Sequence, residues 1–382
     1  MSNLSKPISS ATAILQKYDL CDHCLGRLFS KVPMLSNSVL GKKIRHSLNY
    51  VDVGSCFICK NLIDNLKPYI KLMLESSSKY DYSTFLIGVV IKPSIIDRDD
   101  CLRSKYQFRG TDSIKTNITK ELSKQFIQKT KKRIDFLDPE ITFTINFQEQ
   151  TCHIRSKSIY FQGRYNKTAR GIPQKQTPCT NCLGKGCRTC NYHGISEFYS
   201  IEGKISEFFY SKIGGTTTKF TWIGSEDKSS LVLGSGRPFF IKIQQPLKRH
   251  IHIPSKINCG EVSIFNCKQI SILPQIRSFI SSVAIYVKTE DEITSKNLQN
   301  VKSLLTTPIR IYEKTGKHNE RKIIHLKYRK TSKNRFTLHV KFEGGLPIKR
   351  FVESNDVESS ITQILKMPCT CLHFDFHDVE IL

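Results

Sequence analysis

The chain has 382 residues, of which 39% are hydrophobic and 24% charged, values that are ordinary for a soluble globular protein. This length allows two or three domains with a sizeable core. No stretch is long and apolar enough to cross a bilayer, which excludes a protein with transmembrane helices. The first residues lack a basic region followed by an apolar core, so we expect no secretory signal and a cytoplasmic location.

The charge balance is unusual, because 59 lysines and arginines stand against 33 acids and give a formal net charge of +26. Such an excess is sustained most easily beside a polyanion, through phosphate neutralisation and counterion release. Nucleic acid is therefore the first candidate partner. An anionic membrane surface is the second, but no basic amphipathic helix with a clean apolar face supports it. A generally lysine-rich composition accounts for part of the excess.

The N-terminal part is predicted to be largely helical. Helical spacing of apolar residues predicts helices over residues 8–20 and 36–50, and another from Leu62 to Leu74. Proline removes a backbone donor and clashes with the preceding turn, so Pro68 is expected to kink or interrupt this last helix.

Eight of the fourteen cysteines form Cys-x-x-Cys pairs, and without an export signal we expect zinc thiolates rather than disulfides. Zinc takes four thiolates well. The first predicted set is Cys21, Cys24, Cys56 and Cys59. The second predicted set is Cys179, Cys182, Cys187 and Cys190. The alternatives are two unrelated cysteine pairs at the first set, and a flexible Gly/Cys linker or a redox pair at the second.

From about residue 82 to 165 the pattern becomes α+β. The runs TFLIGVVIKP, ITFTINF and SIYFQGRYNK predict strands, and a basic helix is expected from Ser113 to Arg133. Together they would form a compact RNA-binding module. Residues 166–195 are then expected to form a basic connector around the second cysteine set, followed by one larger α+β domain over 196–382.

Within this larger domain, strands are predicted at FFIKI, RHIHIP, SVAIYVK, KIIHLKY, RFTLHVKF and CLHFDFHDVEIL. Helices are predicted at residues 275–280, 295–305 and 360–365.

A Gly/Ser-rich stretch from Thr221 to Ile243, TWIGSEDKSSLVLGSGRPFFIKI, carries Glu226 and Asp227 on a predicted loop before a strand. Small residues around an acid allow another backbone to approach closely, as an active-site loop requires. The plain alternative is a solvated turn, the usual setting of a loop carboxylate.

Five motifs in series resemble those of the tRNA pseudouridine synthases of the Pus-ten type, found in archaea and eukaryotes. The motifs are CDHCLGRLF, GRYNKTARGIPQ, GSEDKSSLVLGSGRPF, TTPIRIYEK and GGLPIKRFVES. The second cysteine set is most similar to archaeal members. The resemblance implies an α+β protein with a zinc-containing THUMP-type RNA-binding domain over residues 1–165. It also implies a mixed-sheet pseudouridine synthase catalytic domain over 196–382.

The resemblance implies conversion of a tRNA T-arm uridine to pseudouridine, with structural Zn²⁺ and without an organic cofactor or small-molecule cosubstrate. It gives Asp227 the role of catalytic carboxylate, Lys349 that of the cation keeping it ionised, and Tyr286 that of active-site aromatic. The target uridine must leave its stack, which needs a basic lining. Phosphate contacts, with solvated surface charges as the alternative, are expected at Arg164, Lys167, Arg170, Arg237, Lys248 and Arg249. We expect a monomer that acts on tRNA.

The chain departs from the family pattern at several positions. Charged residues of the catalytic loop are replaced by Ser225, Ser229 and Leu231, and the tyrosine of the last motif is Pro347. Tyr286 lies three residues past the expected tyrosine position, now Val283, and a shift of three along a strand reverses the face of a side chain.

Two hypotheses therefore stand. Asp227, the GSGRPF segment and Lys349 favour an active enzyme, whereas the lost loop arginines favour a non-catalytic tRNA-binding protein on the same scaffold. A zinc-dependent nucleic-acid enzyme is a weaker third hypothesis, because the cysteine sets lack the adjacent glutamate base of a zinc deaminase.

Overall fold

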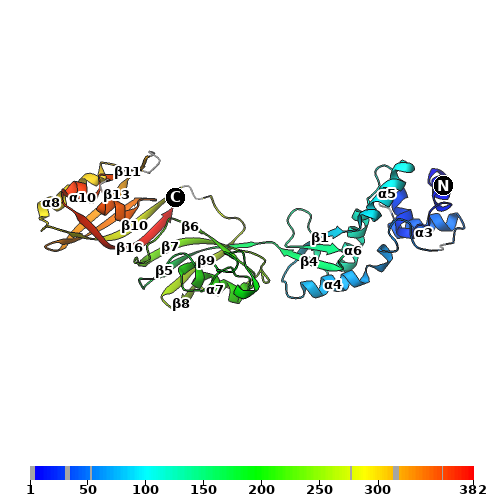
Figure 1. Ribbon diagram of the computed structural model, residues 1–382, viewed down its shortest axis with the longest axis horizontal. Helices are drawn as coiled ribbons and strands as arrows, with labels where there is room; N and C mark the ends of the chain where they lie inside the picture. The colour runs from blue at the N-terminus through cyan, green and yellow to red at the C-terminus, as the bar shows by residue number, and fades with distance from the viewer. Residues whose placement is uncertain (1–4, 31–34, 52–53, 276–277, 313–317, 355) are drawn as a thin grey trace. The chain divides into compact units, whose positions relative to one another are not determined.

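The computed structural model describes residues 5–30, 35–51, 54–275, 278–312, 318–354 and 356–382. The chain divides into two compact units, Met1–Lys157 and Ser158–Leu382. Both combine helices with mixed sheets, which confirms the α+β class predicted from the sequence (Figure 1). Among the described helices, none has the length and apolar character needed to span a membrane.

The N-terminal unit packs helices on a mixed sheet with the strand order β2–β1–β3–β4. The strands are β1 (Thr84–Val90), β2 (Arg133–Ile134), β3 (Ile141–Asn146) and β4 (Thr151–Ser156). The helices are α1 (Ser5–Leu15), α2 (Asp22–Phe29), α3 (Asn37–Ser47), η1 (Ile63–Asn65), α4 (Lys67–Ser77), α5 (Pro93–Lys105) and α6 (Ile114–Thr130). Alternate residues of β1 are buried, and Phe85 packs edge-on against Phe126 of α6 with ring centroids 5.0 Å apart. The period-two pattern of the sequence therefore produces this sheet–helix core.

The predicted helix from Leu62 to Leu74 is interrupted near Pro68, as expected, because η1 ends at Asn65 and α4 begins at Lys67. Pro68 occupies the first turn of α4, so the helix begins there and is not kinked. The backbone N–H groups of a first helical turn have no intrahelical acceptor, which makes this the position where proline costs least.

The C-terminal unit contains a long mixed sheet with the order β13–β14–β10–β16–β7–β5–β9–β8, and β6 pairs with β7. The first strands are β5 (Ile159–Lys167), β6 (Thr218–Trp222), β7 (Val232–Ile243), β8 (Lys256–Cys259) and β9 (Val262–Ile270). The later ones are β10 (Phe279–Thr289), β13 (Ile323–Ser332), β14 (Arg335–Glu343) and β16 (Cys369–Ile381). A smaller sheet joins β12 (His318–Arg321), β11 (Ile309–Tyr312) and β15 (Val357–Glu358).

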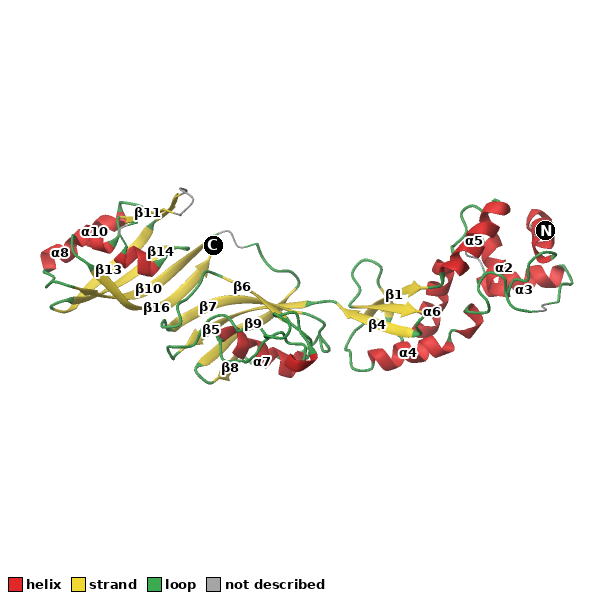
Figure 2. Ribbon diagram, viewed as in Figure 1, coloured by secondary structure: helices red, strands yellow, loops and turns green. Residues whose placement is uncertain are grey.

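Several helices accompany this long sheet and are drawn in red in Figure 2. They are η2 (Arg188–Cys190), α7 (Ile201–Ile213), α8 (Ser295–Gln299), η3 (Asn300–Leu305), α9 (Ile348–Glu353) and α10 (Ile361–Leu365). Phe209 of α7 packs on Phe161 of β5 with ring centroids 4.8 Å apart. The core of the unit lies between these helices and the sheet.

Three predicted elements differ from the structure. The strand SIYFQGRYNK is β5, which pairs with β7 and β9 on its two edges, so it lies inside the C-terminal sheet. The predicted domain boundary at residue 165 accordingly differs from the division after Lys157. RHIHIP is not a strand, because Pro254 has no N–H to donate and β8 begins only at Lys256. Residues 276 and 277 of the predicted helix 275–280 lie outside the described residues, and β10 begins at Phe279.

The sheet is weakly joined between β16 and β7. These parallel neighbours pair only at Phe376 with Val232 and at Asp378 with Gly236. Gly234 has φ +58°, and a Cβ there would lie 2.5 Å from the carbonyl oxygen of His377. Glycine at this position therefore lets the two backbones approach closely. The loop that carries Glu226 and Asp227 leads directly into β7, next to this weak pairing.

Candidate active site and metal centres

The loop between β6 and β7 is held around a buried arginine. The Arg237 guanidinium, from β7, donates to the carbonyl oxygens of Ile223 at 2.9 and 3.2 Å and of Ser225 at 2.9 Å. Gly224 has φ +71°, and a Cβ there would lie 2.9 Å from the same guanidinium. Because Gly224 has no side chain, the loop can pack closely against Arg237. The guanidinium then donates hydrogen bonds to loop carbonyl oxygens that are not paired in a strand.

Glu226 points into the protein. Its side chain is fully buried, and its carboxylate lies 2.9 Å from Lys167 Nζ and 3.9 Å from Arg237 Nη1. The Tyr165 hydroxyl donates to the same carboxylate at 2.7 Å. Burial, together with the neighbouring Glu226 charge, raises the pKa of Tyr165 well above its usual value, so the phenol stays protonated and remains a donor. Glu226 is thereby fixed by cations and a hydroxyl, and it is not accessible to a substrate.

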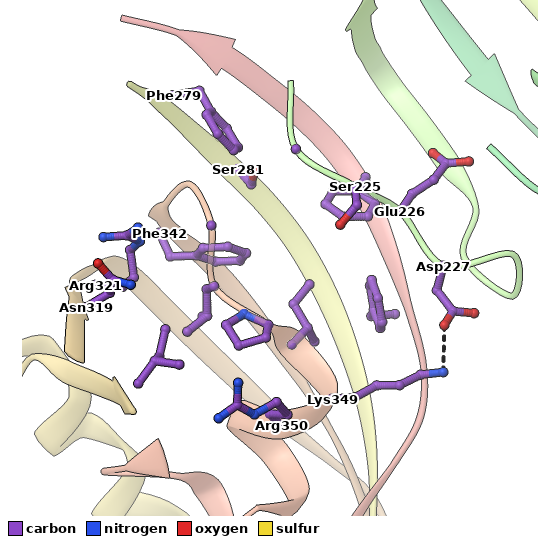
Figure 3. A pocket seen from close by; sticks show the side chains of 18 of the residues that line it. Ser225, Glu226, Asp227, Phe279, Ser281, Asn319, Arg321, Phe342, Lys349 and Arg350 are labelled. Carbon is purple, nitrogen blue, oxygen red and sulfur yellow. Dashed lines mark hydrogen bonds and ion pairs between the residues drawn. The ribbon is translucent and has the colours of Figure 1, made fainter. Parts of the chain in front are cut away.

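Asp227, the next residue, points the other way. Its carboxylate accepts a hydrogen bond from Lys349 Nζ at 2.7 Å, and it also accepts from the backbone N–H and hydroxyl of Ser229 at 2.8 and 2.7 Å. Figure 3 shows Asp227 directed at Lys349 of α9 while Glu226 is directed away. Partial burial opposes ionisation, but the hydrogen bonds outweigh it and lower the pKa of Asp227 to about 2. Asp227 is therefore a partly exposed, ionised carboxylate at neutral pH.

A pocket of about 530 Å³ opens beside Asp227 and Lys349. Its apolar wall includes the rings of Phe279, Phe342, Phe374 and Phe376. Polar groups come from Ser281, Asn319, Arg321 and Arg350, four of the residues that Figure 3 labels around the cavity. This volume and this mixture of apolar walls with a few polar groups are typical of small-ligand sites, and a nucleoside is within their size.

The end of the same loop is attached to β16. Arg170 forms a bidentate pair with Asp375, with N–O distances of 2.6 and 2.8 Å, and it also donates to the carbonyl oxygen of Ser229. Asp375 in turn accepts from the backbone N–H of Leu231 at 2.9 Å. Asp227 thus lies between two fixed points, Glu226 before it and Ser229–Leu231 after it.

The residues predicted to contact phosphate have different environments in the structure. Lys167 and Arg237 are buried and paired with Glu226, and Arg249 is also buried, so these three do not present a charge to a surface-bound RNA. Lys248 is exposed. Arg164 is partly exposed and pairs with Asp378 at 2.9 Å, and Arg170 pairs with Asp375.

Tyr286 lies on the wrong face of β10 for the predicted role. The pairing of β10 with β14 is regular, so Tyr286 and the pocket residue Ser281 point to opposite faces of the sheet. Tyr286 stacks on His373 with ring centroids 4.3 Å apart and an interplanar angle of 28°. Val283, at the position where the family pattern has its tyrosine, is buried. The aromatic lining of the pocket comes instead from phenylalanines that include Phe279, which sequence reasoning missed.

Asp375 was also missed by sequence reasoning. The available signal was an acid inside the aromatic strand pattern HFDFH, combined with Arg170 in the acid-free segment GRYNKTARGIPQKQ. A buried strand acid needs a cationic partner, and only the fold shows that Arg170 supplies it.

Each predicted cysteine set comes together as a group that could hold a metal ion, with its four Sγ atoms within 4.8 Å of one another. Individual Sγ–Sγ distances are 3.6 Å for Cys21–Cys59 and 3.7 Å for Cys187–Cys190. Zinc bonded tetrahedrally to thiolates at about 2.3 Å requires S–S separations of about 3.8 Å, so the donor sets fit this ion.

Glycines shape the second set. Gly186 and Gly194 have φ +90° and +77°, and their backbone N–H groups donate to Cys182 Sγ and Cys190 Sγ at 3.2 Å each. Such donors stabilise thiolates. A Cβ on Gly194 would lie 2.5 Å from the carbonyl oxygen of Gly184, so the tight turns around the sulfur atoms depend on glycine.

Comparisons with known proteins identify the family. A family model described as "Pus10, C-terminal" matches residues 160–380, and one described as "Pus10 THUMP domain, archaeal" matches residues 69–146. The chain belongs to the Pus10 family. It is 54% identical to "tRNA pseudouridine synthase Pus10" of Nitrosopumilus maritimus, with 100% of each chain covered.

More distant relatives carry the same description. The Cenarchaeum symbiosum protein is 32% identical, with 95% of this chain and 90% of the relative covered. The Methanosphaera stadtmanae protein is 29% identical, with 96% and 97% covered. These matches confirm the resemblance read from the five motifs, including its archaeal type and the THUMP domain, and the chain is a pseudouridine synthase of this family.

Because Lys167 is buried beside Glu226, its replacement should destabilise the fold. Lys167→Met should lower the free energy of unfolding by about 3–5 kcal/mol, because it removes the closest cation from the buried Glu226 carboxylate. Lys248→Met, at an exposed position, should change it by less than about 0.5 kcal/mol. Urea unfolding of both variants measures the difference. Equal stabilities would show that the Lys167–Glu226 pair does not hold the loop.

Proposed function

We propose that the chain converts a uridine in the T-arm of tRNA to pseudouridine, with Asp227 as the catalytic carboxylate. The observation that supports this most strongly is the Asp227–Lys349 hydrogen bond of 2.7 Å beside a pocket of about 530 Å³. An ionised carboxylate next to a cavity of nucleoside size is what the reaction requires. The pair also argues against a non-catalytic tRNA-binding role, which has no use for a poised carboxylate.

The reaction is an isomerisation of one nucleotide. The N1–C1′ glycosidic bond of uridine breaks, the uracil turns, C5 bonds to C1′, and the C5 proton is lost while N1 gains one. Atoms and electrons balance without an oxidant, reductant or cosubstrate. Asp227 acts on the sugar or base as nucleophile or general base. Lys349 keeps it anionic before the uridine arrives, so the group is ready without a proton transfer.

The pocket provides the setting for a flipped nucleotide. The uridine must leave its stack to reach Asp227, and unstacking is offset by contact with aromatic walls. Phe279 lines the pocket and packs between Gly224 and Gly344. A Cβ on Gly224 would lie 3.0 Å from the Phe279 ring, and a Cβ on Gly344 would lie 2.3 Å from it. In this proposal Asn319 and Arg321 supply polar contacts to the uracil. The chain would act on tRNA as a monomer, in the cytoplasm.

We further propose that both cysteine sets hold Zn²⁺ in a structural role. Four thiolates occupy all four positions of tetrahedral zinc, which leaves none for a substrate or an activated water. The two sites would then stabilise local folds and take no part in the isomerisation.

The catalytic role of Asp227 is tested by Asp227→Asn. This change keeps the size of the side chain but removes its charge, so turnover should fall to background while the tRNA dissociation constant stays within a few-fold. Tritium release from tRNA labelled at uridine C5 measures turnover. Asp291→Asn, at an exposed position of the same unit, is the control and should behave like the parent. Near-parent turnover by Asp227→Asn would refute the assignment.

The role of Lys349 is tested by the pH dependence of the single-turnover rate. With the pKa of Asp227 at about 2, the parent should lose no activity through protonation of this group between about pH 7 and pH 5. Burial raises the pKa of Asp227, and in Lys349→Met the hydrogen bond that opposes this effect is lost. The pKa of Asp227 should therefore rise, and the acid limb of the rate profile should move toward neutral pH. Lys349→Arg should keep the limb low. Coincident profiles for Lys349→Met and the parent would exclude this role.

The zinc proposal is tested by elemental analysis of the purified protein. We expect two zinc ions per chain, and Cys21→Ser should lose one of them. Because structural zinc contributes directly to folding, Cys21→Ser should also reduce solubility more than Asp227→Ala does. Cys101→Ser, an exposed cysteine outside both sets, should retain both ions. A parent chain that purifies with neither metal would contradict the proposal.

A further inference from the structure

One side of the long C-terminal sheet carries an ordered set of exposed cations. On β14 the residues Phe336, Leu338, Val340 and Phe342 are buried in the core. The alternate residues of β14 therefore point to the opposite side, where Arg335 and His339 are exposed. The pairing register extends this side across β13 and β10, so its members can be assigned without ambiguity.

Like charges lie directly opposite one another on this side. Lys288 of β10 pairs in register with Arg335 of β14. Lys327 of β13 pairs with His339 of β14, and burial together with the neighbouring His377 and Lys327 lowers the pKa of this histidine. Over the ranges that the structure describes, no ion pair involves Lys288, Lys327 or Arg335. Directly opposed like charges destabilise an antiparallel pair. The arrangement therefore has a cost for folding and needs an explanation outside the folded chain.

Aromatic side chains lie on the same side. Tyr286 pairs in register with Thr337 of β14 on one edge and stacks on His373 of β16 on the other. Next along β16, Asp375 is bound by Arg170, which also contacts the Ser229 carbonyl of the catalytic loop. Cations and a partly exposed ring pair thus lie toward the Tyr286–Lys288 end of β10, while acids that include Glu343 and Glu380 lie toward its other end on the same side.

We propose that this surface, the basic sheet face, binds the sugar–phosphate backbone of the tRNA outside the arm that enters the pocket. The basic sheet face is defined as Lys288, Lys327, Arg329, Arg335, His339 and the Tyr286–His373 pair. A polyanion neutralises opposed cations and releases counterions, which turns the folding cost into binding energy. The ring pair adds a platform for an unstacked base.

The position of the pocket explains why only a large RNA would contact both the pocket and the basic sheet face. Phe279, Ser281 and Phe342, which line the pocket, lie on the core side of β10 and β14, opposite the basic sheet face. A short T-arm hairpin with its uridine in the pocket would not extend to the other side of the sheet. A whole tRNA is large enough to contact both sides. The inference rests on the proposed function, because it takes tRNA as the substrate.

The test neutralises three cations of this face. The variant Lys288→Gln/Lys327→Gln/Arg335→Gln should bind whole tRNA at least tenfold more weakly at about 0.1 M salt, and its slope of log affinity against log salt should fall by about two to three. Its affinity and single-turnover rate with an isolated T-arm hairpin should equal those of the parent. Its melting temperature should not fall, because opposed like charges have been removed.

A matched variant separates this surface from net charge. Lys296→Gln/Lys302→Gln/Lys366→Gln removes the same charge from exposed positions on α8, on η3 and directly after α10. It should leave whole-tRNA affinity within about twofold of the parent. Tyr286→Leu should weaken whole-tRNA binding severalfold without changing the salt slope, since stacking is not ionic.

Several results would overturn the proposal. Equal losses in the two triple variants would mean that only net charge matters. An equal loss with hairpin and whole tRNA would mean that the face belongs to the pocket site. Unchanged tRNA binding with loss of binding to anionic lipid vesicles would assign the face to a membrane. If the parent binds whole tRNA but modifies neither RNA, the proposed reaction fails, and the two triple variants still test the face by binding.

Discussion

The geometry of the candidate active site depends on a buried ion pair between Lys167 and Glu226. Both side chains are fully buried, and Tyr165 and Arg237 complete the surroundings of the carboxylate. A buried charge without partners is too costly to persist, so the loop that carries Glu226 can adopt few other positions. Since Asp227 is the next residue, its direction follows from this constraint. The ion pair contributes conformational specificity at the site where a small displacement of the carboxylate would matter most.

Two adjacent acids therefore point in different directions and have different partners. Glu226 is directed into the protein, and Asp227 is directed toward Lys349 beside the pocket. Arg170 and Asp375 hold the other end of the loop. The cations of the motif GRYNKTARGIPQ that look suited to RNA are in part devoted to positioning this loop: Lys167 holds its beginning and Arg170 its end. The charge excess of the chain is consequently a poor guide to which individual cations contact RNA.

The two sides of the long C-terminal sheet have different chemistry. The core side holds the phenylalanines of the pocket and the Asp227–Lys349 pair, while the other side holds opposed cations and the Tyr286–His373 stack. The weak junction between β16 and β7 lets one loop contact both, with Asp227 toward the pocket and the Ser229 carbonyl toward Arg170. The same loop is therefore in contact with both sides of the sheet.

The sequence by itself determined the class of the protein, the two cysteine sets and the identity of the Asp227–Lys349 pair. These rest on local spacing or on motifs, and neither depends on how distant strands register. Only the tertiary structure decided that Lys167 and Arg237 are buried, that β5 belongs to the C-terminal sheet, and that Tyr286 faces away from the pocket. A charged side chain shows no local sign of its burial, because burial depends on which distant backbone covers it. The face of a strand residue likewise depends on register, and a shift of one residue reverses every side chain.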